Sequence, residues 1–329
     1  MKGAPSEPFG PGEGAECPRV TRLYGLVVRS AVPLHHDRPP RPGAPVDLDI
    51  VVGERVAAST EPPPGRILLD MRTDSQHYTG TTCADGFRLR FYGTCDVAVD
   101  AALRRASVHL FPGADPAILP VLVGGAVLAF VLALRGDTVL HGSAVQVGRQ
   151  ALAFVGASGM GKSTMATLLC ADGGQLITDD LLRLDVATTP PTCALGSTEL
   201  RLRKSTGELS ARFKSAPGHR ITGDERYALA VESAQIEDVP LAAIVVPAPD
   251  RSPDTTQVVT QRLDPMTSFL LLSRFPRLLG WVDEEVLRRG FQQLGDVVEK
   301  VPVFVARLPW GPPFQEDLAA EVRRAVGMG

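Results

Sequence analysis

The stretch 151–163, ALAFVGASGMGKS, decides the fold class of this chain. It opens with the apolar run 151–155, which is typical of a buried strand. The loop 156–163 then matches the pattern G-x-x-x-x-G-K-[ST], and an apolar helix is expected from about Lys162 to Cys170. In this order the three elements form a phosphate-binding loop, because glycines let backbone N–H groups curl around an anion at a helix N-terminus. The sequence therefore predicts an α/β fold with a nucleotide site.

The loop itself supplies the residues expected to bind the nucleotide. The ammonium of Lys162 would reach the β- and γ-phosphates, and the hydroxyl of Ser163 would be a ligand of Mg²⁺. The full predicted set comprises Gly156, Ala157, Ser158, Gly159, Met160, Gly161, Lys162, Ser163 and Thr164.

Two adjacent acids and one histidine are the candidates for the chemistry. Asp179 and Asp180 end the apolar run 175–178, where loop-type nucleotide hydrolases carry their second metal contact. Successive strand residues point to opposite faces, so one acid can hold Mg²⁺ while the other faces an acceptor hydroxyl as general base. His141, in a predicted strand before the loop, can tune or relay a proton for these acids, although a structural role fits a lone strand histidine equally well.

Basic residues follow the acids at a distance of about 20–45 positions. They suit a clamp on nucleotide phosphate or on an acidic substrate, and a solvated loop is the alternative. The residues in question are Arg201, Arg203, Lys204, Arg212, Lys214, His219, Arg220 and Arg226.

Strand and helix patterns divide the chain into three parts. Residues 1–18 form a Gly- and Pro-rich tail that we expect to be disordered, 19–112 a β-rich domain, and 113–329 the catalytic domain. Predicted strands in the first half are 23–32, 46–52, 67–71, 87–92 and 106–110. In the second half we expect strands at 138–147, 151–155, 175–178, 241–246 and 301–306, with the first two joined as a hairpin, and helices at 265–279, 284–300 and 316–326.

The apolar segment 117–134, AILPVLVGGAVLAFVLAL, has two interpretations. Its eighteen uncharged residues meet the length criterion for a membrane span. Pro120, Gly124 and Gly125 interrupt it, and no basic cluster flanks it. These features favour a buried core helix over a membrane span.

Composition excludes several classes of protein. The chain has 329 residues, 44 % hydrophobic and 22 % charged, with a net charge of −3, which is globular and lacks the basic excess of a nucleic-acid binder. Its five cysteines are an odd number without C-x-x-C spacing, which argues against a disulfide framework and against a structural zinc site. Reduced thiols indicate a cytoplasmic protein.

The run 141–184, HGSAVQVGRQALAFVGASGMGKSTMATLLCADGGQLITDDLLRL, resembles the catalytic domain of the HPr kinase/phosphorylase family (the HPr serine kinase C-terminal domain). The His-Gly pair, the hairpin, the phosphate loop, one helix and a double Asp occur in the same order. The resemblance implies a fold related to phosphoenolpyruvate carboxykinase, ATP-dependent phosphorylation of a serine hydroxyl, and a possible homo-oligomer. It implies that Asp179 is the general base with His141 beside it, that Lys162 is catalytic, and that Asp180 contacts the metal with Ser163.

The chain also departs from that family. Thr164 stands where those enzymes usually carry Glu, residues 202–208 (LRKSTGE) replace a longer Gly-rich signature, and residues 19–112 do not resemble their regulatory domain. The chain looks more like the divergent members that phosphorylate a serine near the end of a precursor peptide, such as a lasso peptide. We therefore predict a Mg²⁺-dependent, ATP-using kinase that acts on a serine of a peptide or protein. A small-molecule hydroxyl kinase of a specialised biosynthetic pathway and a non-catalytic nucleotide-binding regulator are the alternatives.

Overall fold

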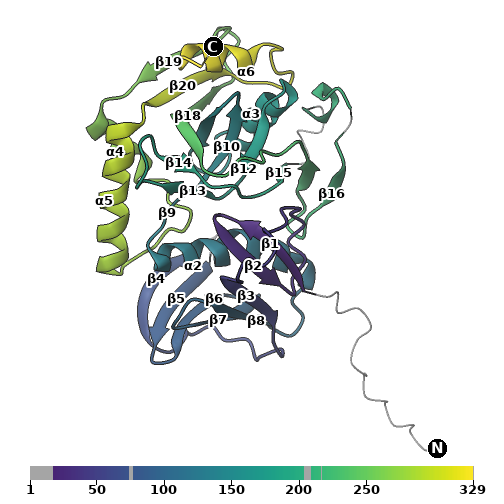
Figure 1. Cartoon of the computed structure of the whole chain (residues 1–329), viewed down its shortest axis with the longest axis vertical. Coiled ribbons are helices and arrows are strands. Elements are labelled where there is room, and N and C mark those ends of the chain that lie inside the picture. Colours follow the sequence, from purple (N-terminus) through teal and green to yellow (C-terminus); the bar gives the residue numbers. More distant parts are fainter. Residues whose placement is uncertain (1–17, 74–76, 204–208, 216, 329) are drawn as a thin grey trace, which may run out of the picture.

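The computed structural model describes residues 18–73, 77–203, 209–215 and 217–328, so nearly all of the predicted tail 1–18, and Lys204, lie outside the described residues. Two bodies are stacked in it, one built from the first third of the chain and the other from the remainder (Figure 1). Each body has its own sheet, and the α/β fold class is confirmed.

The first body is an eight-stranded sheet in the order β1-β2-β3-β8-β7-β6-β5-β4. Its strands β4 to β8 form an antiparallel meander, while β3 runs parallel to both β2 and β8. The strands are β1 (Arg19–Leu23), β2 (Leu26–Ser30), β3 (Leu48–Val52), β4 (Arg66–Arg72), β5 (His77–Cys83), β6 (Gly86–Phe91), β7 (Cys95–Asp100) and β8 (Arg105–Leu110).

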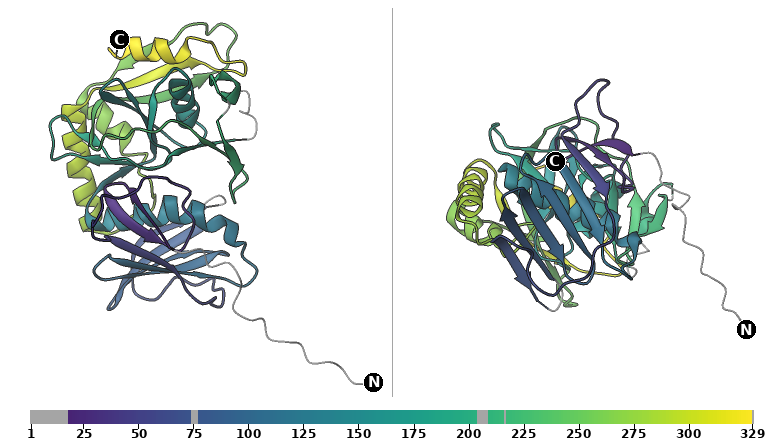
Figure 2. Two further views of the ribbon diagram at one scale, coloured as in Figure 1. Left: turned by 45° about the vertical axis from the view of Figure 1, so that its right-hand side comes forward. Right: turned by 90° about the horizontal axis from the view of Figure 1, so that it is seen from below.

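The apolar segment is a continuous helical run that packs on this sheet, between the two bodies (Figure 2). It comprises η1 (Pro116–Ile118), α1 (Leu119–Leu122), the π-helical η2 (Val123–Val127) and α2 (Leu128–Arg135). Pro116–Arg135 is long and apolar enough to span a membrane, and 56 % of its most apolar window is buried inside the protein. Phe130 lies in the core between Phe87 and Trp281. The domain boundary predicted at residue 113 stays a prediction, but the packing places the helix in the core of the first body.

The second body is built on a nine-stranded mixed sheet, in which the path β12-β10-β11-β18-β14-β13-β9 is joined by β20 and β19. The predicted hairpin is confirmed as the antiparallel pair β10 and β11, and β11 runs parallel to β18. The strands are β9 (Thr138–Leu140), β10 (Gly142–Val147), β11 (Gln150–Val155), β12 (Gln175–Thr178), β13 (Leu182–Asp185), β14 (Thr192–Cys193), β18 (Val239–Asp250), β19 (Val259–Arg262) and β20 (Val303–Pro309).

Helices and a small sheet surround this core. The helices are α3 (Lys162–Ala171), α4 (Pro265–Leu272), α5 (Glu284–Lys300) and α6 (Leu318–Ala325), and the strands β15 (Glu199–Leu202), β17 (Tyr227–Ala230) and β16 (His219–Ile221) form a separate three-stranded sheet. Helix α3 follows the phosphate loop and ends at Ala171, and Gly173 just beyond it has a φ of +92°, the left-handed turn predicted there.

Three sequence-based boundaries are wrong. The predicted strand 138–147 is two strands that separate at His141, because β9 pairs with β13 whereas β10 pairs with β11 and β12. The predicted strand 23–32 is a hairpin whose turn lies at Tyr24 and Gly25, both with positive φ. The predicted helix 265–279 ends at Leu272 as α4, since the chain then runs alongside β9 to form a bridge between Leu140 and Pro276.

Candidate active site

The phosphate loop has the conformation that anion binding requires. Gly159 and Gly161 have φ of +87° and +88°, a region in which a Cβ is strained and in which successive N–H groups can curl around an anion. The Lys162 Nζ donates to the carbonyl of Ala157 at 2.9 Å, which holds the ammonium within the loop. Burial lowers the pKa of Lys162 to about 8, and Asp179 and Asp180 oppose that shift. The loop therefore presents one cation and a set of N–H donors to the same point.

Asp179 lies against the loop serine. Its Oδ1 accepts hydrogen bonds from Ser163 Oγ at 2.8 Å and from Ser143 Oγ at 2.5 Å, and its Oδ2 accepts one from the backbone N–H of Arg201 at 2.8 Å. The side chain is almost completely buried. A serine hydroxyl and a carboxylate in contact at the start of α3 fit Mg²⁺, which typically takes one or two protein oxygens together with phosphate oxygens. Consistent with so few protein ligands, no cluster of three His, Cys, Asp or Glu side chains suitable for a metal occurs among the described residues.

Asp180 faces a different set of partners. Its Oδ2 accepts from Arg277 Nη2 at 2.8 Å and from Arg201 Nη1 at 3.3 Å, and its Oδ1 lies 3.3 Å from His141 Nδ1. Burial opposes ionisation of this carboxyl, but Arg277, His141 and Arg201 hold its pKa well below the usual range. Asp180 is an ionised carboxylate at neutral pH.

His141 is oriented by Asp180. Its Nδ1 lies 3.0 Å from the backbone carbonyl of Asp180 and 3.3 Å from the carboxylate. Burial lowers the pKa of His141 to about 4, against the opposing effect of Asp180, so the ring is neutral at pH 7. Since both neighbours of Nδ1 are acceptors, the hydrogen-bond pattern assigns the proton to Nδ1 and leaves Nε2 as an acceptor. The family resemblance implied that His141 lies beside Asp179; the structure corrects this, because the imidazole contacts Asp180 instead.

The two aspartates diverge because of the backbone between them. Asp180 has φ of +72°, a conformation that non-glycine residues rarely adopt and that Asp tolerates better than most. Asp180 lies outside the strand, because β12 ends two residues earlier at Thr178. This turn directs Asp179 to Ser163 and Asp180 to His141, so the two adjacent carboxylates have different hydrogen-bond partners.

A cavity of about 170 Å³ connects the loop with both aspartates. From the predicted nucleotide-binding set it is lined by Ser158, Gly159, Gly161, Lys162, Ser163 and Thr164. Gly156, Ala157 and Met160 do not line it; Met160 packs under the loop, where its sulfur accepts from the Ala157 N–H at 3.0 Å. From the predicted basic cluster, Arg201, Arg203 and Arg226 line the cavity.

The other basic residues have different roles. Arg220 makes a bidentate pair with Glu199, with hydrogen bonds of 3.1 and 2.6 Å, and Arg212 holds the carbonyls of Phe314 and Gln315. His219 packs on the ring of Tyr227 in the small sheet. The phosphate clamp is therefore only part of the run that the sequence suggested.

Several residues of the site belong to no sequence motif and were not predicted. Arg251, at the end of β18, and Trp310, just after β20, line the nucleotide cavity. A methyl group at Gly161 would lie 2.2 Å from the Trp310 ring, so the indole packs directly on the loop. Ser143 and Arg277 contact the aspartates from β10 and from the segment after α4. These positions come together only through the sheet order, which sequence spacing does not reveal.

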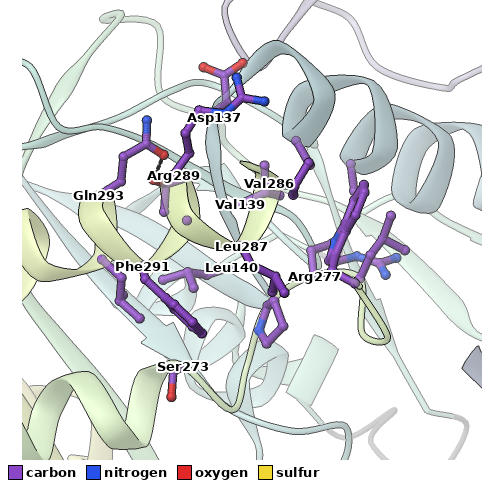
Figure 3. Close-up of a pocket in the computed structure, with 18 of the residues that line it drawn as sticks. Asp137, Val139, Leu140, Ser273, Arg277, Val286, Leu287, Arg289, Phe291 and Gln293 are labelled. Carbon is purple, nitrogen blue, oxygen red and sulfur yellow. Dashed lines mark hydrogen bonds between the residues drawn. The ribbon is translucent and has the colours of Figure 1, made fainter. Parts of the chain in front are cut away.

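Arg277 also joins the site to a second cavity, of about 240 Å³, on the other side of β9 (Figure 3). Its walls are largely apolar and come from α2, β9, the segment after α4, and α5, with Leu140, Val286 and Phe291 among them. The backbone N–H of Arg277 donates to the carbonyl of Val139 at 3.1 Å. This hydrogen bond holds the backbone of Arg277 against β9, and His141 is the residue that directly follows β9.

Comparison with known proteins gives a distant match. No protein-family model matches the sequence, and no curated protein is similar to it. Among solved structures, the Hpr(Ser) kinase/phosphatase from Coxiella burnetii is similar over 56 % of this chain and 94 % of that one, with 12 % identity and a TM-score of 0.30. The roles proposed for the site residues rest on the geometry described above.

Proposed function

We propose that the protein is a Mg²⁺-dependent, ATP-using kinase that transfers the γ-phosphate to a hydroxyl group. The observation that supports this most is the contact of 2.8 Å between Ser163 Oγ and Asp179 Oδ1 within the cavity that Asp180 and His141 also line. A phosphate loop, a metal-type serine–carboxylate pair and a second ionised carboxylate in one cavity are the parts that phosphoryl transfer needs.

In this proposal the two aspartates exchange the roles suggested by the family resemblance. Asp179 and Ser163 would hold Mg²⁺, which when bound neutralises charge on the β- and γ-phosphates. Asp180 would accept the proton of the acceptor hydroxyl, because its carboxylate is ionised and lies outside the serine contacts. His141 would donate from Nδ1 to Asp180 and keep that carboxylate in place.

The cations of the cavity complete the mechanism. Lys162 would position the β- and γ-phosphates, while Arg201, Arg226 and Arg251 line the cavity where charge develops on the transferred group. Phosphoryl transfer depends on positioning and electrostatics more than on covalent chemistry, so this arrangement accounts for the principal requirements. The acceptor we favour is a serine of a peptide or protein; the cytoplasmic location, the absence of a nucleic-acid or membrane partner and a possible homo-oligomer stay predictions from the sequence.

Calorimetric titration tests the nucleotide site. Wild-type protein should bind ATP in a Mg²⁺-dependent manner, and Lys162→Ala should lose that binding, because the loop cation is removed. Equal affinity in the two proteins would contradict the loop assignment. Arg149→Ala in the β10–β11 turn is a matched control, since it removes an exposed cation away from the cavity and should bind ATP normally.

A second pair of variants tests the exchanged roles. Asp179→Asn should abolish the Mg²⁺ dependence of ATP binding, whereas Asp180→Asn should bind MgATP and lose transfer to an alcohol, followed as phosphate-ester formation by ³¹P NMR. The reverse pattern would restore Asp179 as the base and Asp180 as the metal contact.

A further inference from the structure

A second, smaller cavity meets the nucleotide cavity at the aspartates. It has a volume of about 40 Å³ and lies between the two bodies. Asp179, Asp180 and Arg201 line both cavities, so the two spaces meet at the same carboxylates. The remaining walls of the small cavity come from both bodies: Tyr24, Leu34, His36, Pro120, Val121, Gly124 and Gly125 from the first, and Ser197, Glu199, Arg220 and Thr222 from the second.

The wall from the first body is firmly attached to the strand that carries the aspartates. Tyr24 sits in the β1–β2 turn, and its N–H donates to the carbonyl of Leu195 at 2.6 Å. Arg38 is 3 % exposed and donates to the carbonyls of Leu176 and Ile177 in β12, as well as to two loops. The first body is thus attached within three residues of Asp180.

His36 presents a hydrogen-bond donor to this cavity. Its Nδ1 accepts from the backbone N–H of Thr198 at 3.4 Å. Burial, assisted by Arg38 and Arg220, lowers the pKa of His36 to about 3, so the ring is neutral and carries its proton on Nε2. A methyl group at Gly124 would lie 4.0 Å from that Nε2 and would meet no other atom within this distance. The donor therefore faces open space beside the π-helical turn.

Glycine at this turn keeps the space open. The helical run widens to a π-turn at Val123–Val127, and such turns are frequent at functional sites. Gly125 is packed tightly, because a methyl group there would lie 2.6 Å from Arg277 Nη2 and 3.2 Å from Asp180 Oδ2. Gly124, in contrast, has room for a side chain, although glycine costs a helix about 1 kcal/mol relative to alanine. The missing side chain leaves volume in front of His36.

We propose that this small cavity receives the acceptor, which enters as a hydroxymethyl group, and that the first body forms half of the acceptor site. The proposal rests on the kinase function inferred above. A volume of 40 Å³ has room for about three water molecules, which suits a primary alcohol on one carbon better than a sugar or aromatic ring. His36 Nε2–H would donate to the acceptor oxygen or its neighbouring carbonyl, and Asp180, which lines both cavities, would flank the acceptor hydroxyl.

The transfer step balances within this arrangement. The acceptor O–H gives its proton to the Asp180 carboxylate as the acceptor oxygen bonds to the γ-phosphorus. The bond from that phosphorus to the bridging oxygen breaks, and ADP leaves with the electron pair. The nucleotide and the acceptor would enter from the two cavities that meet at Asp180, so that the acceptor oxygen can face the γ-phosphorus with the carboxylate at its side.

Acceptor competition tests the size limit. With MgATP, wild-type protein should phosphorylate N-acetyl-L-serinamide and ethanol with kcat/KM at least tenfold above the values for glucose and N-acetyl-L-tyrosinamide. Equal or better transfer to the ring compounds would overturn the proposal, as would MgATP binding with no transfer to any of the four. Failure to bind MgATP at all would instead refute the kinase function, so the two failures are distinguishable.

Variants of Gly124 and His36 test whether the first body forms one wall of the acceptor site. Gly124→Val fills the space in front of His36 and should lower kcat/KM for N-acetyl-L-serinamide at least tenfold, with the dissociation constant of MgATP within twofold of wild type. Gly295→Val is the matched control, because Gly295 is also helical and a Cβ there meets no atom within 4 Å. His36→Leu should raise KM for the acceptor, and His36→Gln, which retains an N–H donor, should restore it. Unchanged transfer in Gly124→Val and His36→Leu would remove the first body from the acceptor site.

Discussion

Replacing Arg38 should separate the unfolding of the two bodies. Its guanidinium is almost completely buried and donates to the carbonyls of Gly196, Ala234, Leu176 and Ile177. Leu176 and Ile177 each keep a second backbone donor, from the N–H groups of Ala234 and Gly196. For the carbonyls of Gly196 and Ala234, Arg38 is the one donor found among the described residues. An Arg38→Met variant fills similar volume and leaves these two acceptors unpaired.

The expected loss follows from those two acceptors. A buried carbonyl left without a partner costs about 1–3 kcal/mol, so two cost about 2–6 kcal/mol. Part of this is offset, because no carboxylate pairs with Arg38 in the described chain and burial already lowers its pKa to about 10. We expect a net loss of about 2–4 kcal/mol in the free energy of unfolding, within the range of buried polar networks.

Two tryptophans allow the assay to follow each body. Trp281 stacks on Phe130 in the core of the first body, and Trp310 lies on the phosphate loop of the second. The Trp281→Phe background leaves Trp310 to report the second body, and the Trp310→Phe background leaves Trp281 to report the first. The two backgrounds should unfold in urea at the same midpoint when Arg38 is present, and at different midpoints when Arg38→Met is added. Arg41→Met removes an exposed arginine that pairs with Glu237, and should change stability by under about 0.5 kcal/mol. A coincident transition in Arg38→Met, at the parent's urea midpoint, would refute the reasoning.

Two further predictions concern His36 and Gly125. Burial keeps the pKa of His36 near 3 in the folded protein, whereas the unfolded chain protonates it near 6.5, so stability should fall as the pH drops between these values, by up to about 1.4 kcal/mol per unit. His36→Gln should remove that contribution in urea titrations at pH 4–7, and an unchanged slope would contradict it. Gly125→Ala should lower phosphate transfer at least tenfold, since its methyl group would displace Arg277 or Asp180, while Gly295→Ala transfers normally in the same assay.

The sequence predicted the strand, loop and helix of the proposed nucleotide site because these elements are local. The loop, helix α3 and the strand that precedes Asp179 follow one another within about 30 residues, and each is marked by glycines or apolar runs inside that segment. The same holds for α5, predicted and found at Glu284–Lys300, where Asp283 caps the first turn and Lys300 lies in the last.

Two strands were not predicted from the sequence because contacts with distant residues, rather than a local residue pattern, define them. Strand β5, HYTGTTC, is polar and was missed; its buried Thr79 and Thr81 are satisfied by Asp70 and by the Pro64 carbonyl, partners that no local pattern reveals. Strand β7 was also missed, although Val97 and Val99 alternate correctly, because the acids that flank it obscured so short a run.

The partners of the two aspartates could not be predicted from the sequence for the same reason, and the roles proposed for these residues rest on those partners. Alternation along a strand shows only that Asp179 and Asp180 face different sides. Which side belongs to the metal depends on Ser143 and Arg277, which reach the pair from β10 and from the segment after α4. Ser143 can only donate a neutral hydrogen bond, whereas Arg277 brings a full positive charge to Asp180. A carboxylate already compensated by arginines gains little from a divalent cation, and one held by hydroxyl and amide donors gains much. The electrostatics of the partners therefore favour Asp179 as the metal contact, and leave Asp180 to face the hydroxyl.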